Sequence, residues 1–318
     1  MSDILETTTV GDLVAHKGRV ISVPDTATIT EVLSTLAVNN LTAVPVAGVS
    51  QYIGFVSVLD VVLHIADNLG QPEKEMGLLA VNIMGQSNES RTLWTLSPTT
   101  KLLEAIEPLS KGIHRFLVPS EDLAEPEAGS APKTGLLSQT DIVRFFLQNV
   151  DYLGPVAAKT VADLGLVDTC QSPVAVPCNI PLVDVLRLMK NEGGVTAIAV
   201  VGAMDGITPG SQPRPVRGGK VLGTISASDF RGLKPDMLRS ITDITVEQFL
   251  TSVSGVDTPK APVTCRPSTP LATVMASAIS SKVHRVWVTN EDGWLSGVVT
   301  FSDIISAIRQ QHKVLVVN

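Results

Sequence analysis

Apolar residues recur with helical spacing at four places in the chain. In the first run Ile29, Val32, Leu33 and Leu36 are spaced i, i+3, i+4, i+7, which places their side chains on one face of a helix. The same phase returns at Leu102, Ala105, Ile106 and Leu109, at Leu182, Val185, Leu186 and Met189, and at Leu271, Val274, Met275 and Ala278. The recurrence predicts four related amphipathic helices, each with one buried face.

A second pattern follows each of these helices. It reads Gly, two residues, a hydroxyl residue, two residues, Asp, and an amphipathic run comes after it. The copies run from Gly54 to Asp60, Gly135 to Asp141, Gly223 to Asp229 and Gly297 to Asp303. In the first copy, strand-like stretches at 19–23, 43–46 and 52–58 and a helix from 60 to 66 complete the unit. The order strand, helix, strand, strand, helix therefore occurs four times, as an internal repeat.

The repeats differ mainly in the loop between their last two strands. Glu121–Lys133 and Gly202–Lys220 are rich in Gly, Pro and charge, and we interpret them as lengthened hairpin loops. The stretch Asp151–Pro155 lacks periodicity, and we place the boundary between two halves there. The predicted repeats are 9–68, 81–150, 159–235 and 245–313, grouped into modules 1–150 and 156–318.

Composition narrows the class of protein. The 318 residues are 44% apolar and 17% charged, which is typical of a globular chain, and no apolar run approaches the ~18 residues of a membrane span. The first residues lack the blocks of a signal peptide, and Cys170, Cys178 and Cys265 show no CxxC spacing. We therefore expect reduced thiols and a cytoplasmic or nuclear location. The net charge of −7 argues against a general nucleic-acid binder.

The repeated motif has groups that suit a nucleotide. A strand glycine permits close approach, the hydroxyl can donate to an anion, and the Asp carboxylate can accept both hydroxyls of a vicinal diol such as ribose. The helix start beside it favours phosphate. The alternative needs no ligand, because Ser/Thr-x-x-Asp is also a helix capping box. For any single copy, capping is the more common explanation.

Basic residues begin the strand before the motif in alternate repeats. His114 and Arg115 stand there in repeat two, and His284 and Arg285 in repeat four. The matching positions hold Thr42 in repeat one and Thr196 in repeat three. Exposed strand ends explain either pair equally well. In two alternate repeats of an acidic chain, in one register, the pairs resemble phosphate ligands.

These features together resemble a known family. The repeat with its closing Gly-x-x-Ser/Thr-x-x-Asp is similar to the CBS (cystathionine-β-synthase) domain. Four in tandem, with His-Arg in the second and fourth, resemble the γ subunit of AMP-activated protein kinase and its yeast and plant four-CBS relatives. The stretches that carry this resemblance are 113–118, 282–288 and 297–304. It implies an α/β (α+β) fold in which four tandem CBS repeats form two Bateman modules, one with two and three with four, in a disc-like pseudo-symmetric assembly.

The resemblance also implies roles for residues. Adenine nucleotides (AMP, ADP or ATP) would lie as regulatory ligands in clefts near the disc centre, with no catalytic cofactor and no metal. Ribose would be bound by Asp60, Asp141, Asp229 and Asp303. Supporting hydroxyls would be Ser57, Ser138, Ser226, Ser228, Thr300 and Ser302, with Thr196 at a strand start facing the ligand. Phosphates would be met by His114, Arg115, His284 and Arg285.

Three departures from the family matter. The animal γ subunit lacks the motif Asp of its second repeat, whereas this chain keeps Asp141. That subunit has a basic residue where Thr42 stands, which weakens a phosphate clamp at repeat one. Few residues precede repeat one, although the family uses an extension there to join a partner subunit. Assembly into a kinase complex therefore stays open.

We accordingly expect a non-catalytic regulatory subunit that binds adenine nucleotides and signals energy state to a protein kinase or another partner. A kinase catalytic subunit and a scaffold subunit are the partners considered, and a homodimer stays open; neither nucleic acid nor a membrane is expected. S-adenosylmethionine or NAD would fit similar clefts. The alternative is a ligand-independent CBS scaffold for protein–protein interaction. An enzyme is disfavoured because the repeats fill the chain and neither a P-loop nor a metal-ligand cluster occurs.

Overall fold

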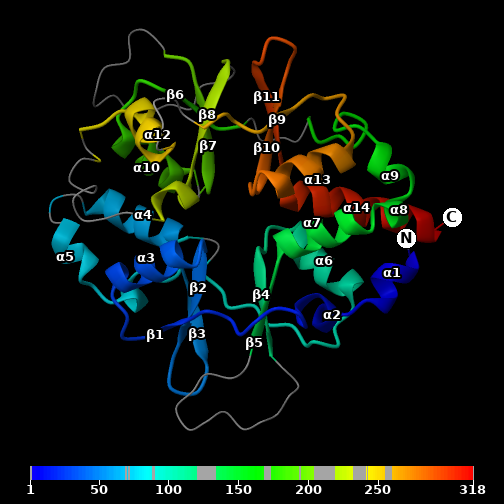
Figure 1. Cartoon of the computed structure of the whole chain (residues 1–318), viewed down its shortest axis with the longest axis horizontal. Coiled ribbons are helices and arrows are strands. Elements are labelled where there is room, and N and C mark those ends of the chain that lie inside the picture. Colours follow the sequence, from blue (N-terminus) through cyan, green and yellow to red (C-terminus); the bar gives the residue numbers. More distant parts are fainter. Residues whose placement is uncertain are drawn as a thin grey trace.

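Four similar units are arranged around a common centre in the computed structural model (Figure 1). Repeats one and two occupy one half of the flattened molecule, and repeats three and four the other. The structure describes residues 2–68, 70, 72–87, 90–119, 134–167, 173–192, 195–203, 219–231, 241, 243–254 and 260–317. Most of the two predicted hairpin loops lies outside these residues. Among them, no helix is long and apolar enough to cross a bilayer.

Repeat one shows the predicted order of elements, and repeat two shows it without the first strand. Repeat one comprises β1 (Val23–Pro24), α3 (Ile29–Val38), β2 (Ala43–Ala47), β3 (Tyr52–Ser57) and α4 (Val58–Asp67). Repeat two comprises α6 (Leu102–Ser110), β4 (Arg115–Pro119), β5 (Thr134–Ser138) and α7 (Gln139–Gln148). A parallel bridge between Thr95 and Leu117 stands where repeat one has β1. The short elements α1 (Ser2–Thr7), α2 (Val10–Val14), α5 (Pro72–Met76) and η1 (Ala80–Asn82) precede or join these repeats.

Repeats three and four follow the same plan. Repeat three comprises β6 (Ala175–Pro177), α10 (Leu182–Asn191), β7 (Ala197–Val201), β8 (Val221–Ser226) and the short 3-10 helix η2 (Ala227–Phe230). Repeat four comprises β9 (Thr264–Cys265), α13 (Leu271–Ser280), β10 (Arg285–Thr289), β11 (Leu295–Thr300) and α14 (Phe301–Val317). The connecting helices are α8 (Val150–Leu153), α9 (Pro155–Ala158) and α12 (Val246–Ser254). Two short helices thus stand where the sequence lacks periodicity.

In repeats one, three and four the sheet is a hairpin with one parallel strand beside it, and in repeat two it is the β4–β5 hairpin alone. In repeat one, β2 pairs antiparallel with β3 and parallel with β1, and repeats three and four have the same order. The prediction of a strand over 19–23 was wrong except at its last residue. The backbone N–H of Val20 donates to the carbonyl of Thr134 at 3.2 Å, so this stretch crosses over repeat two before it joins the repeat-one sheet.

The four predicted apolar helix faces are buried, and this confirms the periodicity. All sixteen face residues are at most 2% exposed. The helices of repeats one and three share one core, and those of repeats two and four share another. Two smaller clusters join the sheets, one around Phe55 and Leu117 and one around Val201 and Trp287. Burial of each large apolar side chain contributes roughly 1.5–3 kcal/mol, so these shared cores fix how the repeats are placed around the centre.

Candidate functional site

Strand register brings the two predicted sets of polar residues together. In repeat two Arg115 lies opposite Ser138, and in repeat four Arg285 lies opposite Thr300. The start of the first hairpin strand therefore meets the end of the second, where the motif hydroxyl stands. Ala43 opposite Ser57 and Ala197 opposite Ser226 show the same register in repeats one and three. In the view of Figure 1, these ends of the four hairpins face the centre.

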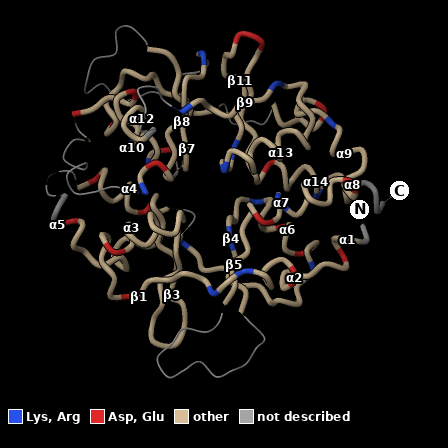
Figure 2. Tube along the Cα trace, in the orientation of Figure 1, with Lys and Arg blue, Asp and Glu red and all other residues tan. Residues whose placement is uncertain are grey.

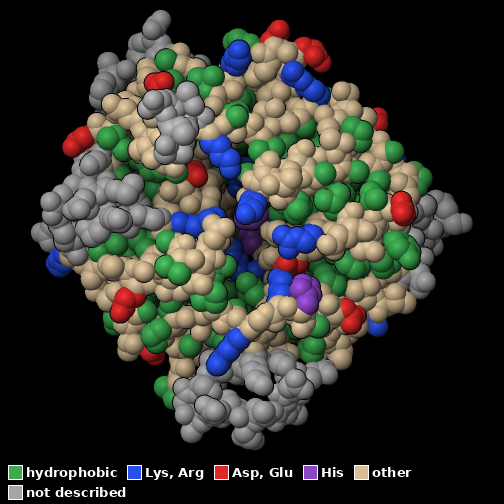
Figure 3. All heavy atoms as spheres, viewed as in Figure 1, with side chains coloured by type: hydrophobic (Ala, Val, Ile, Leu, Met, Phe, Trp, Pro, Cys, Tyr) green, Lys and Arg blue, Asp and Glu red, His purple; other side chains and the backbone are tan. Residues whose placement is uncertain are grey.

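The centre of one face is hollowed and basic. Figure 3 shows Lys and Arg side chains around a hollow between the four repeats, with a His side chain within it. Figure 2 shows Lys and Arg near the inner ends of the hairpins, where some acidic residues also lie, and many other acidic residues at the periphery. In a chain with a net charge of −7, this clustering creates a local positive potential. An anionic ligand is therefore favoured at the centre.

All four motifs form the capping box that the sequence offered as the alternative. In repeat one, Oδ2 of Asp60 accepts from the backbone N–H of Ser57 at 2.8 Å and from its hydroxyl at 2.6 Å. Equivalent bonds join Ser138 to Asp141, Ser226 to Asp229 and Thr300 to Asp303. Each box uses Oδ2, so the contacts that the carboxylate makes beyond its cap decide what else each acid can bind.

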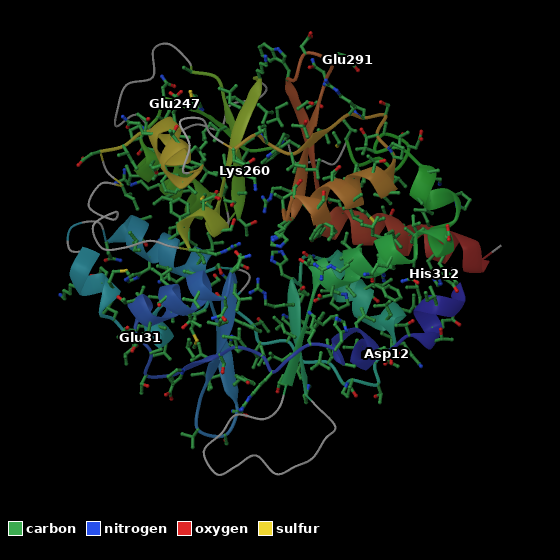
Figure 4. All side chains as sticks on the ribbon, viewed as in Figure 1. Asp12, Glu31, Glu247, Lys260, Glu291 and His312 are labelled. Carbon is green, nitrogen blue, oxygen red and sulfur yellow. The ribbon has the colours of Figure 1, made fainter. Side chains whose placement is uncertain are left out.

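Capping alone does not identify a ligand site. The same box occurs at Thr9 with Asp12 and at Thr28 with Glu31. Figure 4 places Asp12 and Glu31 toward the rim, away from the central hollow. What distinguishes the four motif acids is therefore their position at the inner ends of the hairpins.

The motif acid of repeat one, Asp60, is completely buried. Asp60 is 0% exposed, and its Oδ1 accepts from the backbone N–H of Ser87 at 2.7 Å and the hydroxyl of Ser90 at 2.6 Å. Burial raises the pKa of Asp60 above its ordinary value, against the hydrogen bonds that lower it. With four donors around it, this carboxylate has no exposed surface for ribose, and we leave Asp60 and Ser57 out of the proposed ligand site.

The acid of repeat two is paired with a lysine from the start of the chain. Lys17 Nζ lies 2.6 Å from Oδ2 of Asp141 and donates to the carbonyl oxygen of Leu136 at 2.8 Å. Arg144 Nη1 lies 3.8 Å from Oδ1 of the same acid. Sequence reasoning missed Lys17, since no local pattern links positions 124 residues apart.

The acids of repeats three and four keep one oxygen available. Among the described residues, only the cap donates hydrogen bonds to Asp229 and Asp303. Both side chains are partly exposed. Burial raises the pKa of Asp229, while the nearby charges of Arg231 and Lys260 act in the opposite direction. Lys260, beside the β7–β8 hairpin in Figure 4, and Arg231 were both missed from the sequence.

The serines directly before the motif acids of repeats three and four also have side-chain partners. The hydroxyls of Ser228 and Ser226 lie 2.6 Å apart. The Ser302 hydroxyl accepts a hydrogen bond of 2.8 Å from Gln139 Nε2, which also donates to the carbonyl of Leu109. Gln139 follows the motif serine of repeat two, so this contact joins the motifs of repeats two and four.

The predicted phosphate ligands contact neighbouring repeats. Arg285 donates to the hydroxyl of Thr196 and, at 3.1 Å, to the carbonyl of Ala197 at the start of β7. Its neighbour His284 is exposed and packs edge-on against Phe301. In repeat two the Arg115 guanidinium lies 5.8 Å from the ring centre of Phe55, and His114 is partly buried. Each arginine thus reaches the adjacent repeat, and Thr42 lies partly exposed before β2.

Comparison with known proteins agrees with this architecture. The family model of the CBS domain matches residues 10–67 and 253–310. Two Arabidopsis thaliana proteins named SNF1-related protein kinase regulatory subunit gamma-like, PV42b and PV42a, are each 32% identical; the alignments cover 94% and 95% of this chain and 94% of each relative. The Kluyveromyces lactis 5'-AMP-activated protein kinase subunit gamma is 22% identical, over 96% of this chain and 89% of its own length.

A solved structure shows the same fold over the whole chain. It is a Methanocaldococcus jannaschii protein that has been proposed as an archaeal homolog of g-AMPK, with a TM-score of 0.70 and 18% identity. The match covers 94% of this chain and 99% of that one, so the arrangement of four repeats is common to both. The chain therefore belongs to the CBS-domain family of regulatory gamma-like subunits related to SNF1 protein kinases.

Proposed function

We propose that this chain is a non-catalytic regulatory subunit that binds an adenine nucleotide at the inner ends of its hairpins. The observation that carries the proposal is the register that sets Arg285 opposite Thr300, three residues before Asp303. A carboxylate for the ribose hydroxyls and a cation for phosphate then lie at one end of one hairpin, beside a basic hollow (Figure 3). Relatives named as kinase γ subunits support the choice of ligand and partner.

Regulation would depend on nucleotides that bind two arrangements of the repeats with different affinity. Arg285 already links β10 to Thr196 and Ala197 of the neighbouring repeat. A bound phosphate competes for these guanidinium hydrogen bonds and so alters the contact between repeats three and four. AMP, ADP and ATP differ in phosphate charge and length, so they would stabilise different arrangements of this contact. A protein kinase catalytic subunit bound to the disc would respond to that difference.

Isothermal titration with AMP and ATP tests the proposal directly. Asp303→Asn removes the charge of the motif acid and is expected to weaken binding about tenfold or more, as for hydrogen bonds to charged groups. Asp12→Asn is the matched control, because it alters the same kind of capping box away from the hollow. No heat and no thermal shift with millimolar nucleotide would refute nucleotide binding. Equal affinity in the wild type and Asp303→Asn would place the ligand elsewhere.

A second function is favoured by the closed motifs of the first module. Asp60 is fully engaged by the protein's own groups and Asp141 is paired with Lys17, as expected of a scaffold that uses these motifs only as caps. Such a protein would dock partners through its surface without nucleotide. The two functions differ in a simple measurement, because a nucleotide-binding protein purified from cells can carry a 260 nm absorber that acid extraction releases. Affinity capture of partners with and without added AMP then shows whether docking depends on ligand.

A further inference from the structure

The segment that follows α2 covers the motif of repeat two. Figure 1 shows α2 beside the β4–β5 hairpin, with the chain then crossing β5 toward β1. Val14, the last residue of α2, packs so closely on Gly135 that a Cβ at this glycine would lie 3.1 Å from the valine Cβ. The close-approach surface that the motif glycine provides is therefore already occupied by a side chain of the protein itself.

Lys17 occupies the acceptors of the same motif. Its ammonium group donates to Oδ2 of Asp141 and to the carbonyl oxygen of Leu136, at 2.6 and 2.8 Å. Both acceptors belong to the Gly135–Asp141 motif. The carboxylate is 10% exposed and the lysine side chain 28%, so solvent screens this ion pair less than one at the surface. A hydrogen-bonded cation thus sits where the hydroxyl donors of a ribose would have to approach.

We propose that Lys17 is an internal ligand of repeat two, which competes with the ribose diol of a nucleotide for Asp141. This inference rests on the proposed function. The lysine is tethered to the site, so its effective concentration is high, and its hydrogen bond to the carboxylate joins two opposite charges whereas a ribose hydroxyl is neutral. Repeat two therefore stays closed to nucleotide while Lys17 is in place, although its motif is as complete in sequence as that of repeat four.

The contrast with repeat four carries the argument. There a Cβ built at the motif glycine, Gly297, would lie 3.4 Å from the Cβ of its strand partner Val288, an ordinary contact that is looser than the one at Gly135. No described side chain beyond the cap bonds Asp303. The two repeats share the His-Arg pair and the Gly-x-x-Ser/Thr-x-x-Asp motif. They differ in the cation that holds the acid. Lys17, rather than the motif itself, is thus the residue that determines whether repeat two binds.

Counting nucleotide equivalents on the full chain tests this. Lys17→Met keeps the aliphatic stem and removes the ammonium, and by titration with AMP it should bind one equivalent more than the wild type. Lys74→Met, which removes an exposed lysine elsewhere, should match the wild type. The double variant Lys17→Met with Asp141→Asn should return to the wild-type count, because the added site uses the freed carboxylate.

The single variant Asp141→Asn decides the matter even if Lys17→Met does not fold. With Lys17 in place the acid is not used for nucleotide, so Asp141→Asn should leave the number of equivalents and their affinity unchanged. Loss of one equivalent in Asp141→Asn would overturn the inference, as would an unchanged count in folded Lys17→Met. If neither the wild type nor any variant binds AMP or ATP, the proposed function fails and this inference falls with it.

Discussion

Asp60 of repeat one and Asp303 of repeat four end two copies of one motif in different surroundings. Both accept the two hydrogen bonds of a capping box. Asp60 is then covered by Ser87 and Ser90 and is fully buried, whereas Asp303 remains partly exposed beside the Thr300 end of β11. One motif has become part of the protein interior, and the other keeps its acid partly exposed at the inner end of its hairpin. A motif shared by four repeats therefore does not imply four ligand sites.

The comparison predicts a larger loss of stability when Asp60 is replaced than when Asp303 is replaced. Asp60→Ala leaves the buried N–H groups of Ser57 and Ser87 and the Ser90 hydroxyl without their acceptor, which should cost about 2–4 kcal/mol of unfolding free energy. Asp303→Ala loses mainly a cap, at about 1 kcal/mol. Urea denaturation measures both. Equal costs in the two variants would contradict the contrast drawn between a sealed and an open acid.

Arg285 provides a test of nucleotide binding at repeat four, the repeat with the open acid. We expect Arg285→Met to weaken nucleotide binding about tenfold or more, because a charge-assisted phosphate contact is lost. Arg309→Met is a suitable control, since Arg309 pairs with Glu107 at 2.8 Å and is also largely buried, at 17% exposure. Titration with ATP compares the two variants with the wild type. Similar losses in both would point to a general structural effect instead of a phosphate contact.

Much of the fold could be predicted from local pattern, because helix faces and capping boxes are set by residues a few positions apart. The buried faces and all four capping boxes follow that rule. Whether each motif acid is buried, ion-paired or open could not be predicted. Lys17 reaches Asp141 across 124 residues, and Ser90 reaches Asp60 across 30. Such contacts depend on how linkers cross the sheets, and no periodicity in the chain encodes that path.

The contact between repeats two and four offers a smaller test. Gln139 is 8% exposed and links Ser302 to the carbonyl of Leu109. Gln139→Leu keeps most of the volume but removes both donors, so we expect a loss of about 1 kcal/mol in unfolding free energy. Gln310→Leu, at an exposed glutamine that bonds Ser306, is the control and should change stability little. If the two variants unfold alike, the link between the motifs carries no stability.

The smallest expected effect concerns how stability depends on pH at two capping boxes. The contributions of Asp12 and Asp229 should change in opposite directions as pH rises. Hydrogen bonds from Thr9 lower the pKa of Asp12, so its contribution to stability is present above the unfolded value of 3.8 and is lost as pH falls through the folded value. Burial raises the pKa of Asp229, so the favourable contribution of its protonated form is present below 3.8 and is lost as pH rises through the folded value.

Unfolding free energies of the wild type, Asp12→Asn and Asp229→Asn, measured by urea denaturation from pH 3 to 7, separate these two cases. The stability advantage of the wild type over Asp12→Asn should shrink toward the acid end, where the wild-type carboxylate becomes protonated. The difference between the wild type and Asp229→Asn should move the other way, with the wild type losing ground as pH rises above about 4. Parallel curves for the two pairs would show that the inner and outer boxes have the same electrostatic environment, and that burial at the hollow does not distinguish Asp229 from an ordinary helix cap.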